Sequence, residues 1–294
     1  MNPKVIFHLG VHKTASTHLQ RSFKKNQDLL DEYGFTYINP KQCREALFPI
    51  TLKLRDGGDE ASLQKHTEMV FHGAANGNPN LIISDENMIG HLDQLINKNL
   101  IYPWSHFRLA RFFRLLPTHE FEMFVGLRNL ATYLPSAYVE NLLHAKYQTF
   151  ESFMNHSNPW DFSWATMMRR FGNMPAGRKF NVWRYEDYGS TKSEIVSQMT
   201  TPALAHRFKF INKHPRPILS HAAVDYFAKA RNSGRTERSI EILQEAGELF
   251  PIGEQHPAFQ PFSQQDIEKA TEKYTQDIRM IAIMDHVRMV APTE

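Results

Sequence analysis

The sequence predicts an α/β fold, with a mostly parallel sheet covered by helices on both faces and followed by a mainly helical C-terminal portion. Short apolar runs at residues 4–9, 81–84 and 121–127 have the length and composition of buried strands. Segments with helical periodicity separate them, and this alternation is typical of parallel sheets. The ligand is then expected at the carboxyl ends of the strands.

The expected elements follow in chain order from the first strand. Apolar residues at helical spacing run from Leu19 to Tyr33, and Gly34 is well placed to end that helix. Residues 39–59 contain two prolines and two adjacent glycines, which predict an irregular excursion near the site. Further strands are expected at 35–38, 81–87, 120–128 and 179–187, and helices at 61–75, 103–116, 131–145 and 160–171.

We expect a single domain over residues 1–294, with an α/β core at 1–190 and a mainly helical annex at 191–294. The chain contains no evident linker or internal repeat. The annex shows helical patterns at 220–232, 236–248 and 264–284.

Composition restricts the possible functions. The net charge is +3 and the basic residues are dispersed, so no nucleic-acid partner is expected. Cys43 is the only cysteine, which excludes an intramolecular disulfide and fits a reducing compartment. The N-terminus has no signal-peptide pattern, the apolar runs are only strand-length and no HExxH motif occurs. We therefore expect a cytoplasmic protein without a membrane span or a metal site.

The segment KVIFHLGVHKTASTHLQ, residues 4–20, predicts a strand, a loop and a helix. Backbone N–H groups and the positive end of a helix dipole converge where such a loop enters its helix, which suits an anion. A lysine adds a full charge, and small hydroxyl residues allow the backbone to approach a phosphate closely. The residues assigned to this phosphate site are Gly10, His12, Lys13, Thr14, Ala15, Ser16 and Thr17.

A second phosphate site is predicted after the strand at 120–128. Arg128 ends that strand and offers a planar fork for phosphate oxygens. Ser136 lies eight residues later on the first turns of the next helix and supplies a hydroxyl. Both side chains can face the crevice at the carboxyl ends of the strands.

The first loop is not the standard nucleoside-triphosphate loop, because Lys13 follows Gly10 after only two residues. HLGVHKTASTHLQ instead resembles the 5′-phosphosulfate loop of sulfotransferases that use 3′-phosphoadenosine 5′-phosphosulfate (PAPS), especially soluble bacterial-type carbohydrate sulfotransferases. Ala15 stands where that family usually has a glycine. The spacing of Arg128, Ser136 and Tyr138 resembles the family's 3′-phosphate segment.

This resemblance covers residues 4 to about 190 and implies a P-loop-like fold. It also implies transfer of a sulfuryl group from PAPS, without a metal, to a hydroxyl of a small molecule or glycan, such as a carbohydrate or glycolipid. Lys13 would then stabilise the leaving oxygen, and Arg128 with Ser136 would hold the 3′-phosphate.

The catalytic base is expected in the acidic run after the strand at 81–84. In related carbohydrate sulfotransferases an acid near the third strand is the base, and Glu86 is the closest positional match. Asp85 is its competitor, and His12 and His8 rank lower. An acid in this position is also often a helix cap, and His8 suits packing within the sheet.

Two other functions remain open from the sequence. A P-loop kinase-like phosphotransferase would need a standard lysine loop, which is missing, and a magnesium-binding acid, which Asp85 could supply. A non-catalytic nucleotide-binding module would keep the donor loop without turnover. Neither the acceptor nor the oligomeric state is evident from the sequence.

Overall fold

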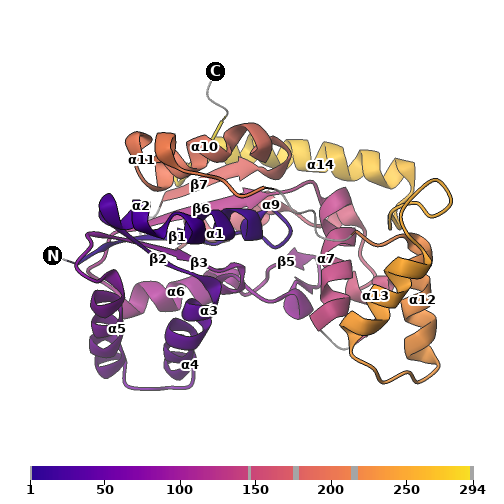
Figure 1. The fold of residues 1–294 in the computed structure, drawn as a ribbon, viewed down its shortest axis with the longest axis horizontal. Coiled ribbons are helices and arrows are strands. Elements are labelled where there is room, and N and C mark those ends of the chain that lie inside the picture. Colours follow the sequence, from indigo (N-terminus) through magenta and orange to yellow (C-terminus); the bar gives the residue numbers. More distant parts are fainter. Residues whose placement is uncertain (1, 145–146, 175–178, 213–217, 292–294) are drawn as a thin grey trace.

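The computed structural model describes residues 2–144, 147–174, 179–212 and 218–291. Its centre is a six-stranded sheet in the order β2-β3-β1-β6-β7-β8, in which every neighbouring pair is parallel (Figure 1). The strands are β1 (Lys4–His8), β2 (Phe35–Ile38), β3 (Asn80–Ser84), β6 (Phe121–Leu127), β7 (Lys179–Arg184) and β8 (Val287–Met289). A separate antiparallel pair consists of β4 (Ile96–Asn97) and β5 (Leu100–Ile101).

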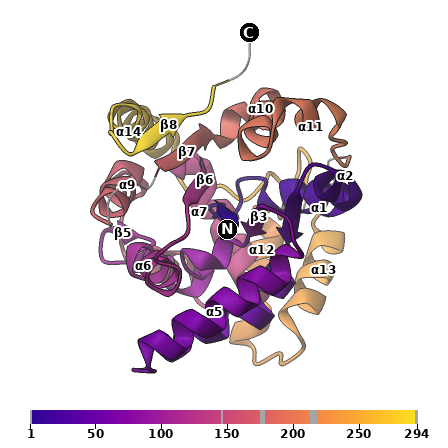
Figure 2. The ribbon, with the colours of Figure 1, turned by 90° about the vertical axis from the view of Figure 1, so that its left-hand side faces the viewer.

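Helices cover both faces of the sheet, as the sequence predicts. They are α1 (Ser16–Lys25), α2 (Gln27–Glu32), α3 (Pro40–Gln42), α4 (Phe48–Arg55), α5 (Glu60–Ala75), α6 (Ser105–Leu115), α7 (Leu130–His144), α8 (Phe150–Phe153), α9 (Trp164–Gly172), α10 (Tyr188–Met199), α11 (Pro202–Arg207), α12 (His221–Asn232), α13 (Ser239–Leu249) and α14 (Gln264–Ala282). Figure 2 shows α1, α2, α10 and α11 on one face, and α5, α6, α9 and α14 on the other.

The alternation of side chains along the strands explains the two covered faces. Ile6 of β1 packs into the cluster shared with α1, α10 and α11, whereas its neighbours Val5 and Phe7 pack into the larger cluster on the opposite face. All three side chains are at most 2% exposed. The parallel α/β fold class is therefore confirmed.

The prediction of an irregular excursion at residues 39–59 was wrong. This segment contains α3, a π-helical turn at Cys43–Leu47 and α4. Pro40 is the first residue of α3 and Pro49 the second residue of α4. A missing N–H costs little in the first turn of a helix, and Asn39 caps α3. The prolines start helices here, and only Gly57 and Gly58 follow the helical segment as breakers.

The C-terminal portion is mainly helical, but it returns to the sheet through β8, a strand that we did not predict. Val290, just after β8, donates its N–H to the Val182 carbonyl of β7. Strand β8 has only three residues, which is too few for an alternating pattern to identify a strand in the sequence so soon after the helical pattern of α14. No helix in the described ranges is long and apolar enough to cross a membrane.

Helix α7 continues through Pro135, which the sequence places inside it. A proline cannot donate to the carbonyl four residues earlier, here Ala131. That carbonyl accepts a hydrogen bond from Gln260 Nε2 at 3.1 Å instead. Figure 1 shows α7, α12 and α13 together beyond one end of the sheet.

Candidate functional site

The loop between β1 and α1 is tightly folded at the carboxyl edge of the sheet. Gly10, Lys13 and Ala15 have positive φ angles of 46°, 64° and 65°. A Cβ atom at Gly10 would lie 2.3 Å from Ser16 Oγ, so only glycine fits there. Ala15 is the N-cap residue of α1 and takes the left-handed conformation that a glycine would adopt without strain.

The hydroxyl groups of the loop serve its internal structure in this conformation. Thr14 Oγ1 and Ser16 Oγ both donate to the Val11 carbonyl, at 2.5 and 3.4 Å. The two side chains are 1% and 5% exposed. Both hydroxyls are therefore engaged within the loop, and their contact with a phosphate stays a prediction. Thr17 lies half-buried on the first turn of α1.

Lys13 reaches a carboxylate that the sequence analysis did not single out. Its Nζ lies 3.1 Å from Glu140 Oε2 on α7, and the two side chains are only 14% and 13% exposed. Glu140 lies four residues after Ser136, so the two share one face of α7. The spacing from Ser136 was a signal in the sequence that Glu140 could face the same crevice.

Arg128 joins the second predicted phosphate site to the first. Its Nη1 donates to the Lys13 carbonyl at 3.0 Å, and its Nε donates to Thr132 Oγ1 at 3.1 Å. The guanidinium lies 4.5 Å from the centre of the Tyr185 ring, and burial lowers its pKa. The structure thus brings Arg128 and the Lys13 loop together, with the Ser136 face of α7 beside them.

The two acids after β3 occupy different environments. Asp85 is fully buried, and its two oxygens accept hydrogen bonds from Arg44 Nε at 2.8 Å and Arg44 Nη2 at 2.9 Å. Burial raises the pKa of Asp85, with Arg44 opposing that shift. It also caps the short 3-10 helix Glu86–Met88 through the Asn87 N–H. Asp85 therefore has a structural role that also fixes Arg44.

Glu86 keeps part of its carboxylate accessible. Its side chain is 17% exposed, Oε2 accepts from Gln20 Nε2 at 2.9 Å, and Oε1 lies 3.9 Å from Arg44 Nη2. Burial alone would raise the pKa of Glu86, but the charge of His12 when it is protonated, the hydrogen bond from Gln20 and the charge of Arg44 favour the carboxylate. Glu86 is therefore an ionised carboxylate at neutral pH.

His12 forms a buried hydrogen-bond network. Nδ1 lies 2.5 Å from the Tyr102 hydroxyl, which is 3.0 Å from the Tyr133 hydroxyl, and Nε2 lies 3.2 Å from the Asn87 amide. With the Asn87 nitrogen facing the imidazole, its oxygen can accept from Arg44, so Nε2 is the acceptor and Nδ1 carries the proton. Burial lowers the His12 pKa, against the charge of Glu86. Both ring nitrogens of His12 are thus engaged, and its catalytic role, which the sequence ranks below that of Glu86, stays a prediction.

His8 is enclosed within the sheet. It is 1% exposed, its Nδ1 lies 2.7 Å from Ser84 Oγ, and its ring stacks on Trp183 at 6.0 Å. Burial lowers its pKa to about 4, so the imidazole is neutral. These contacts give His8 a packing role.

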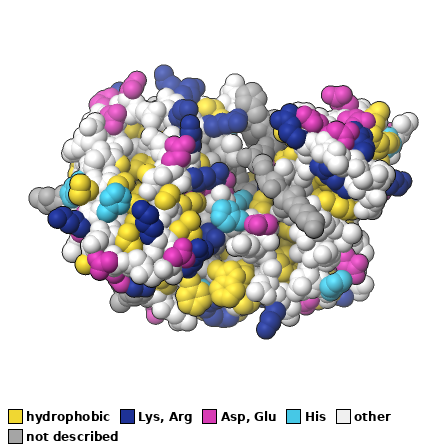
Figure 3. Space-filling view, turned by 90° about the horizontal axis from the view of Figure 1, so that it is seen from below, with side chains coloured by type: hydrophobic (Ala, Val, Ile, Leu, Met, Phe, Trp, Pro, Cys, Tyr) yellow, Lys and Arg dark blue, Asp and Glu magenta, His cyan; other side chains and the backbone are white. Residues whose placement is uncertain are grey.

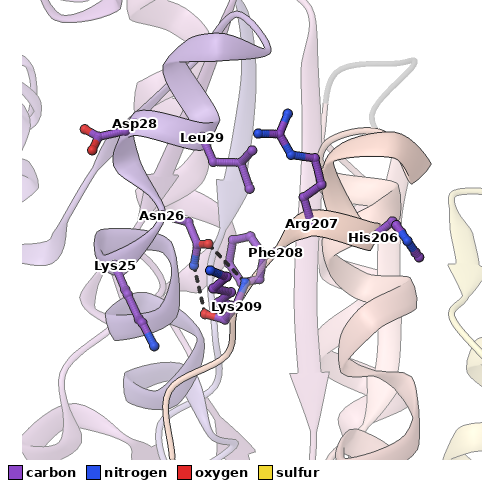
Figure 4. A pocket seen from close by; sticks show the side chains of 8 residues that line it. All are labelled: Lys25, Asn26, Asp28, Leu29, His206, Arg207, Phe208 and Lys209. Atoms are coloured by element: carbon purple, nitrogen blue, oxygen red, sulfur yellow. Dashed lines mark hydrogen bonds between the residues drawn. The ribbon is translucent and has the colours of Figure 1, made fainter.

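One cavity of about 630 Å³ lies away from this loop, at the C-terminal end of α1 (Figure 4). Its basic lining includes Lys209. Together with Lys213 and Arg216, Lys209 belongs to the segment FKFINKHPRP, in which the sequence suggests either donor contacts or, more simply, a solvated basic turn. The Lys209 backbone is fixed by Asn26: its N–H donates to Asn26 Oδ1 at 3.0 Å, and its carbonyl accepts from Asn26 Nδ2 at 2.9 Å. Lys213 and Arg216 lie outside the described residues.

No protein-family model matches this sequence, and no curated protein matches it. Among solved structures, the chain is similar to the sulfotransferase from Alicyclobacillus acidocaldarius, with 13% identity, a TM-score of 0.41, and 83% and 95% of the two chains covered. It is also similar to the sulfotransferase domain from the curacin biosynthetic pathway (13% identity, TM-score 0.39, 92% and 98% covered). A third similar structure is retinol dehydratase in complex with androsterone and the inactive cofactor PAP (13% identity, TM-score 0.33, 95% and 82% covered). These similarities are too distant to assign an activity or a residue role to this chain.

Proposed function

We propose that this protein is a sulfotransferase that moves a sulfuryl group from PAPS to a hydroxyl of a carbohydrate or glycolipid. The observation that carries the proposal is the 3.0 Å hydrogen bond from Arg128 to the Lys13 carbonyl. It joins the two segments that resemble the 5′-phosphosulfate and 3′-phosphate motifs into one cationic site. A donor with phosphates at both ribose positions suits such a pair of sites.

The groups in this site fit an anionic donor. None of the described residues hydrogen-bonds to Arg128 Nη2 or to the half-buried Ser136 hydroxyl, so both can contact the 3′-phosphate. The loop before α1 offers N–H groups at a helix N-terminus for the 5′-phosphosulfate. PAPS supplies the sulfuryl group, bonded to the 5′-phosphate oxygen that departs with PAP. Lys13 balances the charge that grows on that oxygen.

Glu86 is the proposed general base. Its ionised, partly exposed carboxylate can take the proton from the acceptor hydroxyl as the oxygen attacks sulfur. Both Asp85 oxygens are engaged by Arg44, and both His12 nitrogens are engaged within the loop network. The engagement of Asp85 also weakens the kinase alternative, because a magnesium-binding acid needs accessible oxygens.

Calorimetric titration with PAP, AMP and ATP tests the proposed donor. PAP should bind more tightly than AMP by about 1.5–3 kcal/mol, the value of a hydrogen bond to a charged group. Arg128→Ala should remove most of that difference, whereas Arg207→Ala, at the distant cavity, should leave it unchanged. Equal affinities for PAP and AMP would refute the donor assignment, and a preference for ATP would favour the kinase.

Single-turnover sulfation tests the base. Glu86→Gln keeps the shape of the side chain, so PAP affinity should survive while the chemical step slows by about 10²- to 10⁴-fold. His12→Gln is the parallel variant, since it also lies in the site. Near-normal rates in Glu86→Gln with a collapse in His12→Gln would transfer the role to His12. PAP binding without sulfation of any glycan acceptor would favour a non-catalytic module.

A further inference from the structure

Two large aromatic side chains are exposed at the start of α6. Trp104 is 51% exposed and Phe107 is 53% exposed, and their ring centres lie 6.2 Å apart. Figure 3 shows hydrophobic side chains exposed on the face over which α4, α5 and α6 lie. Side chains of this size are usually more buried, so their joint exposure points to a binding role.

The segment that presents these rings is held by two arginine side chains. Arg170 of α9 donates to the Ile101 and Pro103 carbonyls at 2.7 and 3.0 Å. Arg108 donates to the Asn87 carbonyl at 3.1 Å. The aromatic pair is therefore a pre-formed surface, and little conformational entropy is lost when a ligand stacks on it.

Tyr102 connects this surface to the donor site. Its buried hydroxyl contacts both Nδ1 and the backbone N–H of His12, beside Lys13. Its φ angle is 47°, a strained value for a tyrosine that the surrounding contacts must stabilise. Such strain is often retained near functional sites.

The aromatic pair also lies at the edge of the sheet where the acceptor must enter. Helix α6 leads into the amino end of β6, so its own start lies at the carboxyl edge of the sheet, next to Glu86–Met88. The His106 ring contacts that of Phe107, with ring centres 4.0 Å apart, and Arg108 is the next residue along α6. An apolar face bordered by hydrogen-bond donors matches the apolar C–H face and hydroxyl rim of a sugar ring.

We infer that Trp104 and Phe107 form the acceptor subsite and stack on a pyranose ring whose hydroxyl is directed toward Glu86. This inference rests on the proposed function and assigns its acceptor class to named residues. Stacking would hold the sugar by its face, and the hydroxyls at its rim would contact His106 and Arg108.

The test is saturation-transfer NMR and tryptophan-fluorescence titration of the full chain, with and without PAP. The probes are cellobiose, lactose, N-acetylglucosamine and methyl β-glucoside, with cyclohexanol as the non-sugar control. At least one sugar should bind, and Trp104→Ala or Phe107→Ala should weaken it about three- to tenfold. Trp104→Phe should retain most of the affinity, and Ile283→Ala, an exposed apolar residue at the end of α14, should retain all of it.

Each alternative result has a defined meaning. Absence of sugar binding, equal binding of cyclohexanol, or sugar affinity unchanged in both alanine variants would overturn the inference. PAP affinity should be the same in wild type and Trp104→Ala. Failure of the wild type to bind PAP would refute the donor proposal, whereas PAP binding without sugar binding would refute only the aromatic subsite.

Discussion

Replacing Glu140 by glutamine separates stability from donor binding. The variant keeps the side-chain shape but leaves Lys13 without its carboxylate at 3.1 Å. We expect the ligand-free protein to be less stable and PAP to bind more tightly. Both effects have the same cause, because Glu140 neutralises in the free protein the Lys13 charge that the 5′-phosphate of PAP would use.

The magnitudes follow from the geometry of the pair. At 3.1 Å and an effective dielectric constant of about 20, the Coulomb attraction is about 5 kcal/mol before desolvation is subtracted. Side chains that are 14% and 13% exposed lie between the buried and surface cases, so we expect a net loss of about 2 kcal/mol. Removing one negative charge next to the proposed phosphate site should strengthen PAP binding about tenfold.

The assay is a double-mutant cycle with Lys13→Gln, Glu140→Gln and the double variant. Urea unfolding gives the coupling energy in the free protein, and calorimetry gives the PAP affinity of each variant. Lys13→Gln should lower stability and also weaken PAP binding, in contrast to Glu140→Gln. Weaker PAP binding in Glu140→Gln, or additive stability effects in the cycle, would refute the neutralisation of Lys13 by Glu140.

Three further predictions concern stability. His8→Gln removes an imidazole whose pKa falls from 6.5 in the unfolded chain to about 4 in the folded protein. As the pH falls from 7 to 4, the free energy of unfolding of the wild type, measured by urea titration, should decrease by about 3 kcal/mol relative to that of the variant. Ala15→Gly should raise the free energy of unfolding by about 0.5–1 kcal/mol by relieving a positive φ, whereas Ala110→Gly inside α6 should lower it by a similar amount. Gln260→Leu orphans the Ala131 carbonyl beside Pro135 and should cost about 1–2 kcal/mol, measured as a lower thermal midpoint.

Each stability prediction has a contrary outcome. A wild-type pH profile parallel to that of His8→Gln would mean that His8 is not buried in the neutral form. Destabilisation by Ala15→Gly would show that the loop does not hold a left-handed residue there. An unchanged midpoint in Gln260→Leu would indicate that the Ala131 carbonyl has another partner, such as water.

The sequence predicted the fold well because its signals are local. Continuous apolar runs such as 81–84 are buried on both faces of a parallel sheet, and helical periodicity identified α6, α7, α12 and α14 to within a few residues. The failures at residues 39–59 and at β8 have different causes. Proline can start a helix as well as break one, and a three-residue strand is defined by its partner β7 rather than by its own composition.

The site was less accessible to sequence reasoning than the fold. Lys13, Glu86 and Arg128 each follow a predicted strand, which suggested that they lie together at the carboxyl edge of the sheet. The structure places all three there. Their partners come from elements whose relative placement depends on packing. Arg44 lies in the segment predicted as irregular, and Glu140 lies 127 residues from Lys13.

These partners change the electrostatics that the motifs alone suggest. The loop between β1 and α1, considered by its sequence alone, is a positively charged anion site. In the folded chain, however, Lys13 is paired with Glu140, and Arg44 is paired with Asp85. The positive potential for a donor then rests on Arg128 and the N–H groups at the start of α1 until Lys13 leaves Glu140. If the donor binds as proposed, Lys13 must leave Glu140 to contact it, and we then expect Glu140 to affect both PAP affinity and stability in the cycle proposed above.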